Sequence, residues 1–138
     1  MNEIKAIDTQ KAEVKKADTR KQLGASGESF AASYLQQEGY KVIERNWVCK
    51  AGEADIIAYD QDTLVFIEVK TRRTLTTGFP EEAVTRAKRR RYEIIAAYYL
   101  SQEQRPSMRV RFDVISIILT GTNQAFLKHY RDFFASGE

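Results

Sequence analysis

Apolar and polar positions along the chain recur with two spacings, and each spacing predicts its own kind of element. Helical spacing covers residues 23–38, where the apolar face begins at Glu28 and the stretch stops at Gly39, a residue suited to helix ends. It returns over residues 80–103, where Pro80 suits a first helical turn. The expected buried faces are Ala31, Ala32 and Leu35 in the first helix, and Val84, Ala87, Arg91, Ile94, Ile95 and Tyr98 in the second.

Stretches rich in β-branched and aromatic residues lie between and after these helices and predict strands. Two of them flank the polar cluster at residues 60–63, which predicts a hairpin whose turn is centred between Gln61 and Asp62. In that register Asp55 lies directly opposite Glu68, whereas a loop with an odd residue count would send one strand's charges to the other face. The expected strands are residues 40–48, the hairpin within 52–72, a central strand at 108–119 and an edge strand at 125–130.

The order α-β-β-β-α-β-β predicts a single α/β domain, with a mixed sheet flanked by helices on its two faces. This domain covers residues 21–138, while the scattered charges of residues 1–20 predict a flexible or partly helical extension. A chain of 138 residues with 43% hydrophobic and 30% charged residues is typical of a globular domain with a real core. No apolar run is long enough to cross a bilayer, and residues 1–5 lack the apolar character of a signal peptide, so we expect a cytoplasmic protein without membrane contact.

Three charged residues interrupt the apolar runs of the hairpin: Asp55, Glu68 and Lys70. Strand alternation puts all three on one face, and a buried charge is costly unless it is paired or binds a metal. Two carboxylates at this separation suit Mg²⁺ or Mn²⁺, and a lysine beside them would activate an attacking water or neutralise a phosphate. An internal salt bridge is the alternative explanation. The single cysteine, Cys49, and single histidine, His129, argue against thiolate or histidine metal sites.

Basic residues concentrate in residues 70–91, where eight lysines and arginines stand against two glutamates. Phosphate contacts supply most of the non-specific affinity for nucleic acids, so a basic run beside the charged hairpin indicates a phosphate-binding surface. A solvated helix face is the ordinary alternative. The candidates for contacts with a nucleic-acid backbone are Arg72, Arg73, Lys88, Arg89 and Arg90.

Asp55, followed after a short hairpin by Glu68-Val69-Lys70, resembles the PD-(D/E)XK nuclease superfamily in its Glu-x-Lys form. A wider set of residues, from about Leu23 to Phe134, is similar to the YraN family of small bacterial proteins. That set is Gly24, Gly27, Glu28, Tyr34, Leu35, Gly39, Tyr40, Asn46, Gly52, Glu53, Asp55, Phe66 to Lys70, Arg72, Lys88 and Arg111 to Asp113. The resemblance implies a restriction-endonuclease-like fold, similar to that of archaeal Holliday-junction resolvases, which are metal-dependent and structure-specific endonucleases.

The resemblance also implies roles for individual residues. Asp55 and Glu68 match the metal-binding carboxylates, and the carbonyl of Val69 matches a further ligand. Lys70 matches the catalytic lysine. Glu28 matches an acidic residue that resolvase-like proteins contribute from the first helix, although its position also suits an exposed glutamate favoured by the helix dipole.

Other positions match the superfamily less closely. Ala54 stands where the superfamily name implies proline, which removes no ligand. Lys88, with Tyr92 four residues later, resembles an accessory helix motif that glutamine usually leads. The role of Asp113 stays open between support of the site, a pair with Arg111 and a cap for a neighbouring group.

Residues and resemblance together predict a Mg²⁺- or Mn²⁺-dependent endonuclease that acts on DNA. Its specificity would be for structure rather than sequence, with branched or single-stranded DNA favoured over plain duplex. Resolvase-like relatives work as dimers, which leaves a homodimer open. The alternative is a non-catalytic protein that binds nucleic acid, or a nuclease partner, through its basic residues; the presence of every motif charge favours the enzyme.

Overall fold

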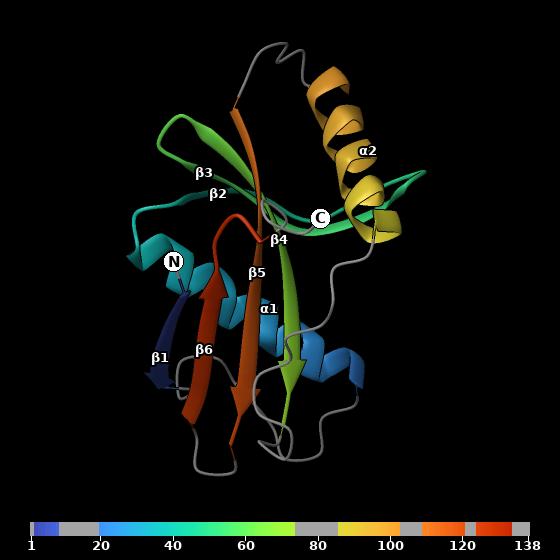
Figure 1. Ribbon diagram of the computed structural model, residues 1–138. Helices are drawn as coiled ribbons and strands as arrows, with labels where there is room; N and C mark the ends of the chain where they lie inside the picture. Colours follow the sequence, from blue (N-terminus) through green and yellow to red (C-terminus); the bar gives the residue numbers. More distant parts are fainter. Residues whose placement is uncertain (1, 9–19, 74–85, 103–108, 121–123, 134–138) are drawn as a thin grey trace.

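The computed structural model describes residues 2–8, 20–73, 86–102, 109–120 and 124–133 (Figure 1). The elements in chain order are β1 (Asn2–Asp8), α1 (Arg20–Gln37), β2 (Lys41–Cys49), β3 (Gly52–Asp60), β4 (Thr63–Arg72), α2 (Arg86–Gln102), β5 (Arg109–Leu119) and β6 (Gln124–Tyr130). The start of the predicted second helix, residues 80–85, lies outside the described residues. No helix in the described part of the chain is long and apolar enough to span a membrane.

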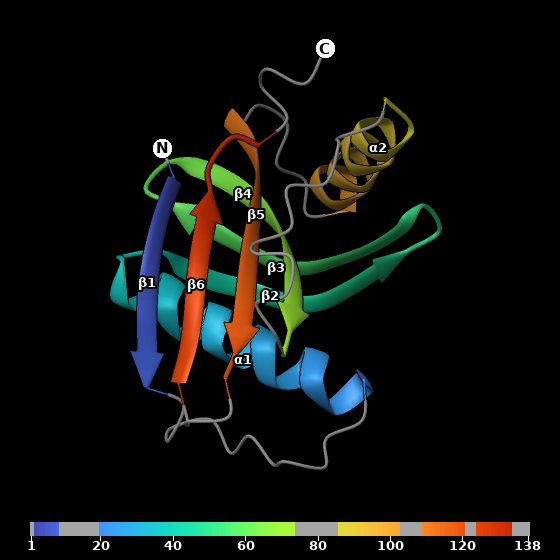
Figure 2. The same ribbon diagram turned by 60° about the horizontal axis from the view of Figure 1, so that its bottom comes forward.

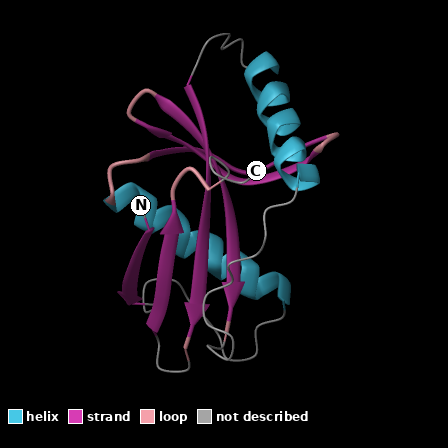
Figure 3. Cartoon of the chain, in the orientation of Figure 1, coloured by secondary structure: helices cyan, strands magenta, loops and turns pink. Residues whose placement is uncertain are grey.

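The six strands that the structure describes belong to one sheet, in the order β1-β6-β5-β4-β3-β2. Among these strands only β4 and β5 pair in parallel, so the chain must cross over between them, and α2 lies on that connection. One face of the sheet packs against α1 and the other against α2 (Figures 1 and 2; Figure 3 shows the same elements by type). The predicted α/β class, with a mixed sheet between helices, is confirmed.

The central strands supply both hydrophobic cores because their side chains alternate between the two faces. Ile56 and Ile67 pack in the core that α1 covers, whereas Ile57 and Phe66 pack in the core that α2 covers. The predicted inward face of α1 is confirmed by the burial of Ala31, Ala32 and Leu35. Because both faces of β3 and β4 are covered along much of their length, a charged side chain that is buried on these strands needs a partner.

The first described residues differ from the prediction of a flexible or partly helical extension over residues 1–20, of which residue 1 and residues 9–19 lie outside the described ranges. Residues 2–8 form β1, which pairs antiparallel with β6 from Asn2↔Tyr130 to Asp8↔Gln124. The predicted edge strand β6 is therefore an inner strand, and β1 takes the edge. The prediction is wrong here because a short segment can pair through its backbone N–H and C=O groups, whatever its apolar pattern.

The predicted hairpin register is confirmed where β3 and β4 pair. Their ladder runs from Asp60↔Thr63 to Ile56↔Ile67 and stops one pair short of the predicted Asp55–Glu68 pair. The first residues of β3 stay paired with β2 instead. This end of the β2–β3 hairpin extends away from β4 and lies beneath α2 (Figure 2).

α2 presents to the sheet a face that is rotated from the predicted one and shares only Ile95 with it among the described residues. Its buried side chains are Tyr92, Ile95, Ala96 and Tyr99. Ile94 and Tyr98, both predicted to be buried, are each 39% exposed. The helix carries two apolar stripes, and the buried stripe is the one whose tyrosine hydroxyls reach carboxylates of the sheet, Glu68 and Glu44.

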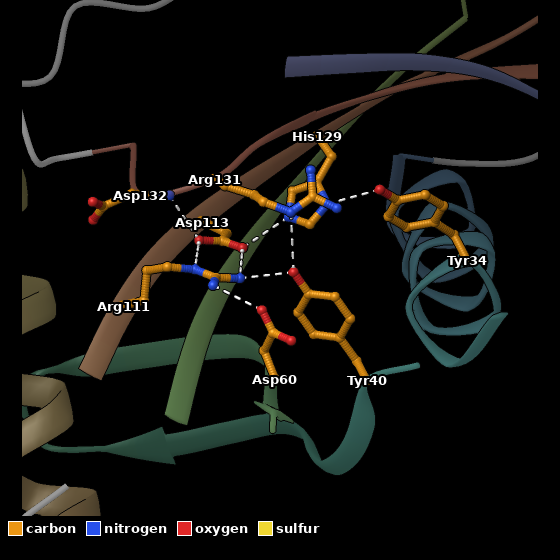
Figure 4. A network of polar contacts seen from close by, with 8 residues as sticks. All are labelled: Tyr34, Tyr40, Asp60, Arg111, Asp113, His129, Arg131 and Asp132. Atoms are coloured by element: carbon orange, nitrogen blue, oxygen red, sulfur yellow. Dashed lines mark hydrogen bonds and ion pairs between the residues drawn. The ribbon is translucent and has the colours of Figure 1, made fainter. Parts of the chain in front are cut away.

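A buried polar network on the α1 side of the sheet is centred on Asp113 (Figure 4). Its carboxylate accepts hydrogen bonds from Arg111 Nε at 2.9 Å and Nη2 at 3.0 Å, and from the backbone N–H of Asp132 at 2.9 Å. It also lies 2.8 Å from His129 Nε2. Burial alone would raise the pKa of Asp113, but the bonds from His129 and Arg111 outweigh burial and lower it. Of the roles left open for Asp113, the structure shows the pair with Arg111 and the backbone cap.

The same network joins elements that are far apart in the sequence. Arg111 also donates to Asp60, in the β3–β4 hairpin, at 2.8 Å and to the hydroxyl of Tyr40, before β2, at 2.7 Å. His129 Nδ1 lies 2.8 Å from the hydroxyl of Tyr34 on α1. Both ring nitrogens of this histidine are therefore occupied, which gives it a structural role.

Candidate active site

The candidate site lies where β3 leaves β4 and α2 faces this part of the sheet. A hollow of about 320 Å³ opens there. Its lining residues are Glu53, Asp55 and Glu68 from the strands and Lys88, Arg91, Tyr92 and Ile95 from α2. The structure therefore brings Asp55 and Glu68 to the same space, although they do not form a ladder pair.

At the end of the β3–β4 ladder, the side chain of Asp55 accepts a hydrogen bond from the backbone of β4. Its Oδ2 accepts the backbone N–H of Val69 at 2.8 Å, which leaves Oδ1 for a ligand. Burial nevertheless raises the pKa of Asp55 to about 7, and the charges of Glu28, Glu68 and Glu53 add to the rise. In the protein alone, this carboxyl is only partly ionised at neutral pH, and a cation beside it would favour the charged form.

Glu68 has the opposite electrostatic environment because three donors hold it. The hydroxyl of Tyr92 donates to Oε1, while Nζ of Lys70 and Nζ of Lys88 lie 3.3 Å and 3.2 Å from Oε2. Burial alone would raise the pKa of Glu68, but Tyr92 and the two lysines outweigh burial and lower it. Glu68 is thus a fixed negative charge at neutral pH. Two of its donors come from α2, so this carboxylate also ties the helix to the sheet.

Glu28, the third predicted carboxylate, lies beside the hollow and is not among its lining residues. Burial raises the pKa of Glu28, against a hydrogen bond from Asn46 and the charge of Arg45. The charge of Glu28 contributes to the raised pKa of Asp55. Within the described ranges, no three Asp, Glu, His or Cys side chains converge as a metal-binding group. The predicted ligands are thus two carboxylates in one hollow, with the third nearby.

Gly27 determines how closely this part of α1 approaches β4. A Cβ at this position would lie 2.8 Å from Cβ of Thr71 and would overlap the threonine hydroxyl. Only glycine allows this approach, and it brings the neighbouring Glu28 close to the sheet.

The groups that line the hollow fit a hard divalent cation. Mg²⁺ takes oxygen ligands, typically one or two carboxylates, and keeps several waters. Among the described residues, no lysine or arginine forms an ion pair with Asp55, so its buried charge lacks the partner that a cation would supply. Val69, whose carbonyl is a predicted ligand, is not among the lining residues.

The predicted nucleic-acid contacts occupy different environments. Lys88 lines the hollow and pairs with a carboxylate of the site. Arg89 pairs with Glu93 at 3.7 Å, one turn along α2, and Arg90 is exposed. Arg91, placed on the buried face by the sequence pattern, is exposed and lines the hollow. Arg72, at the end of β4, and Arg73, directly after it, are half-buried.

Tyr92, Arg91 and Glu53 line the hollow but are not among the predicted site residues. A signal for Tyr92 exists, because it lies four residues after Lys88 on one helix face and a buried tyrosine hydroxyl needs a partner. Burial and the charge of Glu68 raise the pKa of Tyr92, so its phenol keeps its proton and acts as a donor. Arg91 carries no such signal, because its position depends on the rotation of α2 about its axis.

The chain matches the sequence model of the "Uncharacterised protein family UPF0102" over residues 27–117. A UPF0102 protein of Rhodococcus opacus is 48% identical over 112 residues, which are 81% of this chain and 95% of the relative. One of Geobacter sulfurreducens is 42% identical over 112 residues, 81% of this chain and 88% of the relative. One of Caldicellulosiruptor saccharolyticus is 41% identical over 105 residues, 76% and 89% of the two chains. The family predicted from the sequence is thereby confirmed: the chain belongs to family UPF0102, the YraN family.

Proposed function

We propose that this protein is an endonuclease that hydrolyses DNA phosphodiesters with Mg²⁺ or Mn²⁺, on branched or single-stranded DNA. The observation that carries the proposal is the shared hollow of Asp55 and Glu68, with Lys70 Nζ 3.3 Å from Glu68 Oε2. Two carboxylates supply ligands for a cation, and the lysine supplies a positive charge beside it.

Each residue of the site has a role in this proposal. Asp55, through Oδ1, and Glu68 would hold the cation. Such an ion supplies Lewis-acid activation of the phosphodiester when it is bound. Lys70 would donate hydrogen bonds that position the attacking water, and its charge would offset the negative charge that grows on the phosphate. Glu28 would hold a further water at the side of the hollow.

The charges around the hollow support a nucleic acid as the substrate. Lys88 and Arg91 line the hollow, and Arg90 is exposed next to Arg91 on the same helix. Contacts of this kind bind phosphates without reading bases, so the DNA would be selected by its structure. The proposal includes a cytoplasmic location, the compartment that holds the DNA in bacteria such as the relatives named above.

Cleavage of labelled DNA tests the proposal. Purified protein is incubated with single-stranded, duplex, flap and four-way-junction DNA, in Mn²⁺, Mg²⁺ or chelator. Cutting is expected with either metal, and on branched or single-stranded DNA more than on duplex. Asp55→Ala and Lys70→Ala should abolish it, while Asp62→Asn, a change in the exposed turn between β3 and β4, should not.

Two results would count against this function. Cutting that survives both Asp55→Ala and Lys70→Ala would refute the assigned site. Binding without cutting in any metal would favour the non-catalytic alternative.

A further inference from the structure

A second hollow, of about 500 Å³, adjoins the candidate active site. Its lining residues are Ala51, Ala87, Arg90, Arg91 and Ile94. Arg91 lines both hollows, so they meet at this side chain. The second hollow therefore lies beside the place where the scissile phosphodiester would bind.

The turn of the β2–β3 hairpin holds Arg91 at the border between the two hollows. Gly52 has a φ of 147°, and a Cβ there would lie 3.3 Å from Cδ1 of Ile95 and 3.5 Å from Cδ of Arg91. The aliphatic part of Arg91 thus packs on the backbone of Gly52, where there is no side chain. This contact fixes the position of the Arg91 stem. In the part of the chain that the structure describes, neither Arg91 nor Arg90 forms an ion pair, and both are exposed.

The lining is almost entirely apolar, and Arg90 and Arg91 contribute to it mainly through the aliphatic parts of their side chains. Ala51, Ala87 and Ile94 contribute only hydrocarbon. The exposed stripe of α2 continues one turn further to Tyr98, which like Ile94 is 39% exposed. Apolar and aromatic side chains, with arginine planes beside them, are the surfaces on which proteins stack the bases of single strands. The volume is within the usual range of pockets for small ligands, about 300–1,000 Å³.

We infer that the second hollow binds an unstacked nucleobase of a single strand, adjacent to the phosphodiester in the active site. The inference rests on the proposed function and narrows its substrate to DNA that is single-stranded at the cut. A base inside a duplex is stacked and paired, so its face is not available to this surface. Phosphates on either side of the base would meet Arg90 and Arg91.

Charge favours this occupant over a second copy of the chain. A symmetric contact through this face of α2 would bring Arg90 and Arg91 of both copies together. Like charges placed against each other across an interface are costly. A nucleotide, by contrast, carries a negative charge, which would pair with these arginines.

Binding in chelator tests the inference without any cleavage. The full chain is titrated, by fluorescence anisotropy, into a labelled oligothymidylate and into a strand of equal length and charge whose central nucleotides are abasic. The wild type is expected to bind the strand with bases at least about fivefold more tightly, the effect of one stacked base. Ile94→Ser should remove this preference and leave the affinity for the abasic strand unchanged. Arg91→Met, which keeps the packing on Gly52, should weaken binding to both strands.

A matched control is available in Val48, another aliphatic side chain, which is 68% exposed and lines neither hollow. Val48→Ser should keep the preference for bases. Light scattering of each variant reports the oligomeric state. A dimer that Ile94→Ser dissociates, without a change in base preference, would assign this face to contact between copies and overturn the inference.

The outcomes separate this inference from the proposed function. Equal affinity of the wild type for the two strands would overturn the base site, even if the protein cuts DNA. Cutting of fully paired duplex as efficiently as single strands would overturn it as well. A base preference that Ile94→Ser removes, in a protein that cuts nothing in Mn²⁺, would support the base site and refute the hydrolytic function.

Discussion

Replacing Asp55 with asparagine is expected to stabilise the protein in the absence of divalent cations. The asparagine has nearly the same shape, and its carbonyl oxygen can accept the Val69 N–H that Asp55 accepts at 2.8 Å. The substitution removes only the negative charge, which burial and the neighbouring carboxylates disfavour. The wild type therefore carries a destabilising group that the proposed cation site requires.

The magnitude follows from the pKa of Asp55, which rises from 3.8 to about 7 in the folded protein. A pKa difference of one corresponds to about 1.4 kcal/mol in the free energy of unfolding. Above pH 7 the whole difference therefore lowers the stability of the wild type by about 4 kcal/mol. Part of the carboxyl still contacts water, so we expect about half of this, about 2 kcal/mol. Because the folded protein binds this proton more tightly than the unfolded chain, the wild type loses stability as the pH rises from about 4 to about 7.

Urea unfolding in chelator, at about pH 4 and about pH 8, measures this difference. Asp55→Asn should be more stable than the wild type at the higher pH and nearly equal to it at the lower pH. Asp62→Asn, in the exposed turn of the same hairpin, should match the wild type at both. Added Mn²⁺ should stabilise the wild type but not Asp55→Asn, since only the wild type offers both carboxylates.

The opposite result would refute the reasoning. If Asp55→Asn is less stable than the wild type at about pH 8, its charge is already compensated in the folded protein. A gain of equal size at about pH 4 would show that the charge is not its source.

Substitutions at three further contacts are tested by urea unfolding at neutral pH. Tyr92→Phe removes a donor from the buried Glu68 carboxylate and should destabilise the protein by about 1–3 kcal/mol; no change would show that this hydrogen bond is absent in solution. Gly27→Ala should destabilise it by about 1–3 kcal/mol through overlap with Thr71, and Thr71→Ala should relieve part of that loss; an additive double mutant would argue against the contact. Asp113→Asn should destabilise it by about 1–3 kcal/mol, because the half-buried Arg111 keeps its pair with Asp60 but loses the charge of Asp113, and a neutral effect would contradict the network.

The β3–β4 hairpin shows which parts of the site can be predicted from the sequence. Its register follows from a polar turn and alternating apolar residues, both of which are local, and the structure confirms it from Asp60↔Thr63 to Ile56↔Ile67. The end of the ladder cannot be predicted in this way. It depends on packing between the β2–β3 hairpin and α2, where Gly52 meets Arg91 and Ile95.

The rotation of α2 and the N-terminal strand could not be predicted, for related reasons. The helix has two apolar stripes, and spacing alone does not say which one meets the sheet. Which stripe is buried depends on partners from other elements, such as the Glu68 carboxylate that accepts the hydrogen bond of Tyr92. β1 pairs through its backbone with a strand more than a hundred residues away in the sequence, and side-chain pattern contains little information about such a pairing.

Titration with Mn²⁺, followed by the electron paramagnetic resonance signal of the free ion, most directly tests whether Asp55 and Glu68 form a cation site. The wild type is expected to bind Mn²⁺, and both Asp55→Asn and Glu68→Gln should lose that binding, while Asp62→Asn should keep it. Undiminished Mn²⁺ binding by Asp55→Asn and Glu68→Gln, or none by the wild type with or without DNA, would contradict a cation site at these two carboxylates.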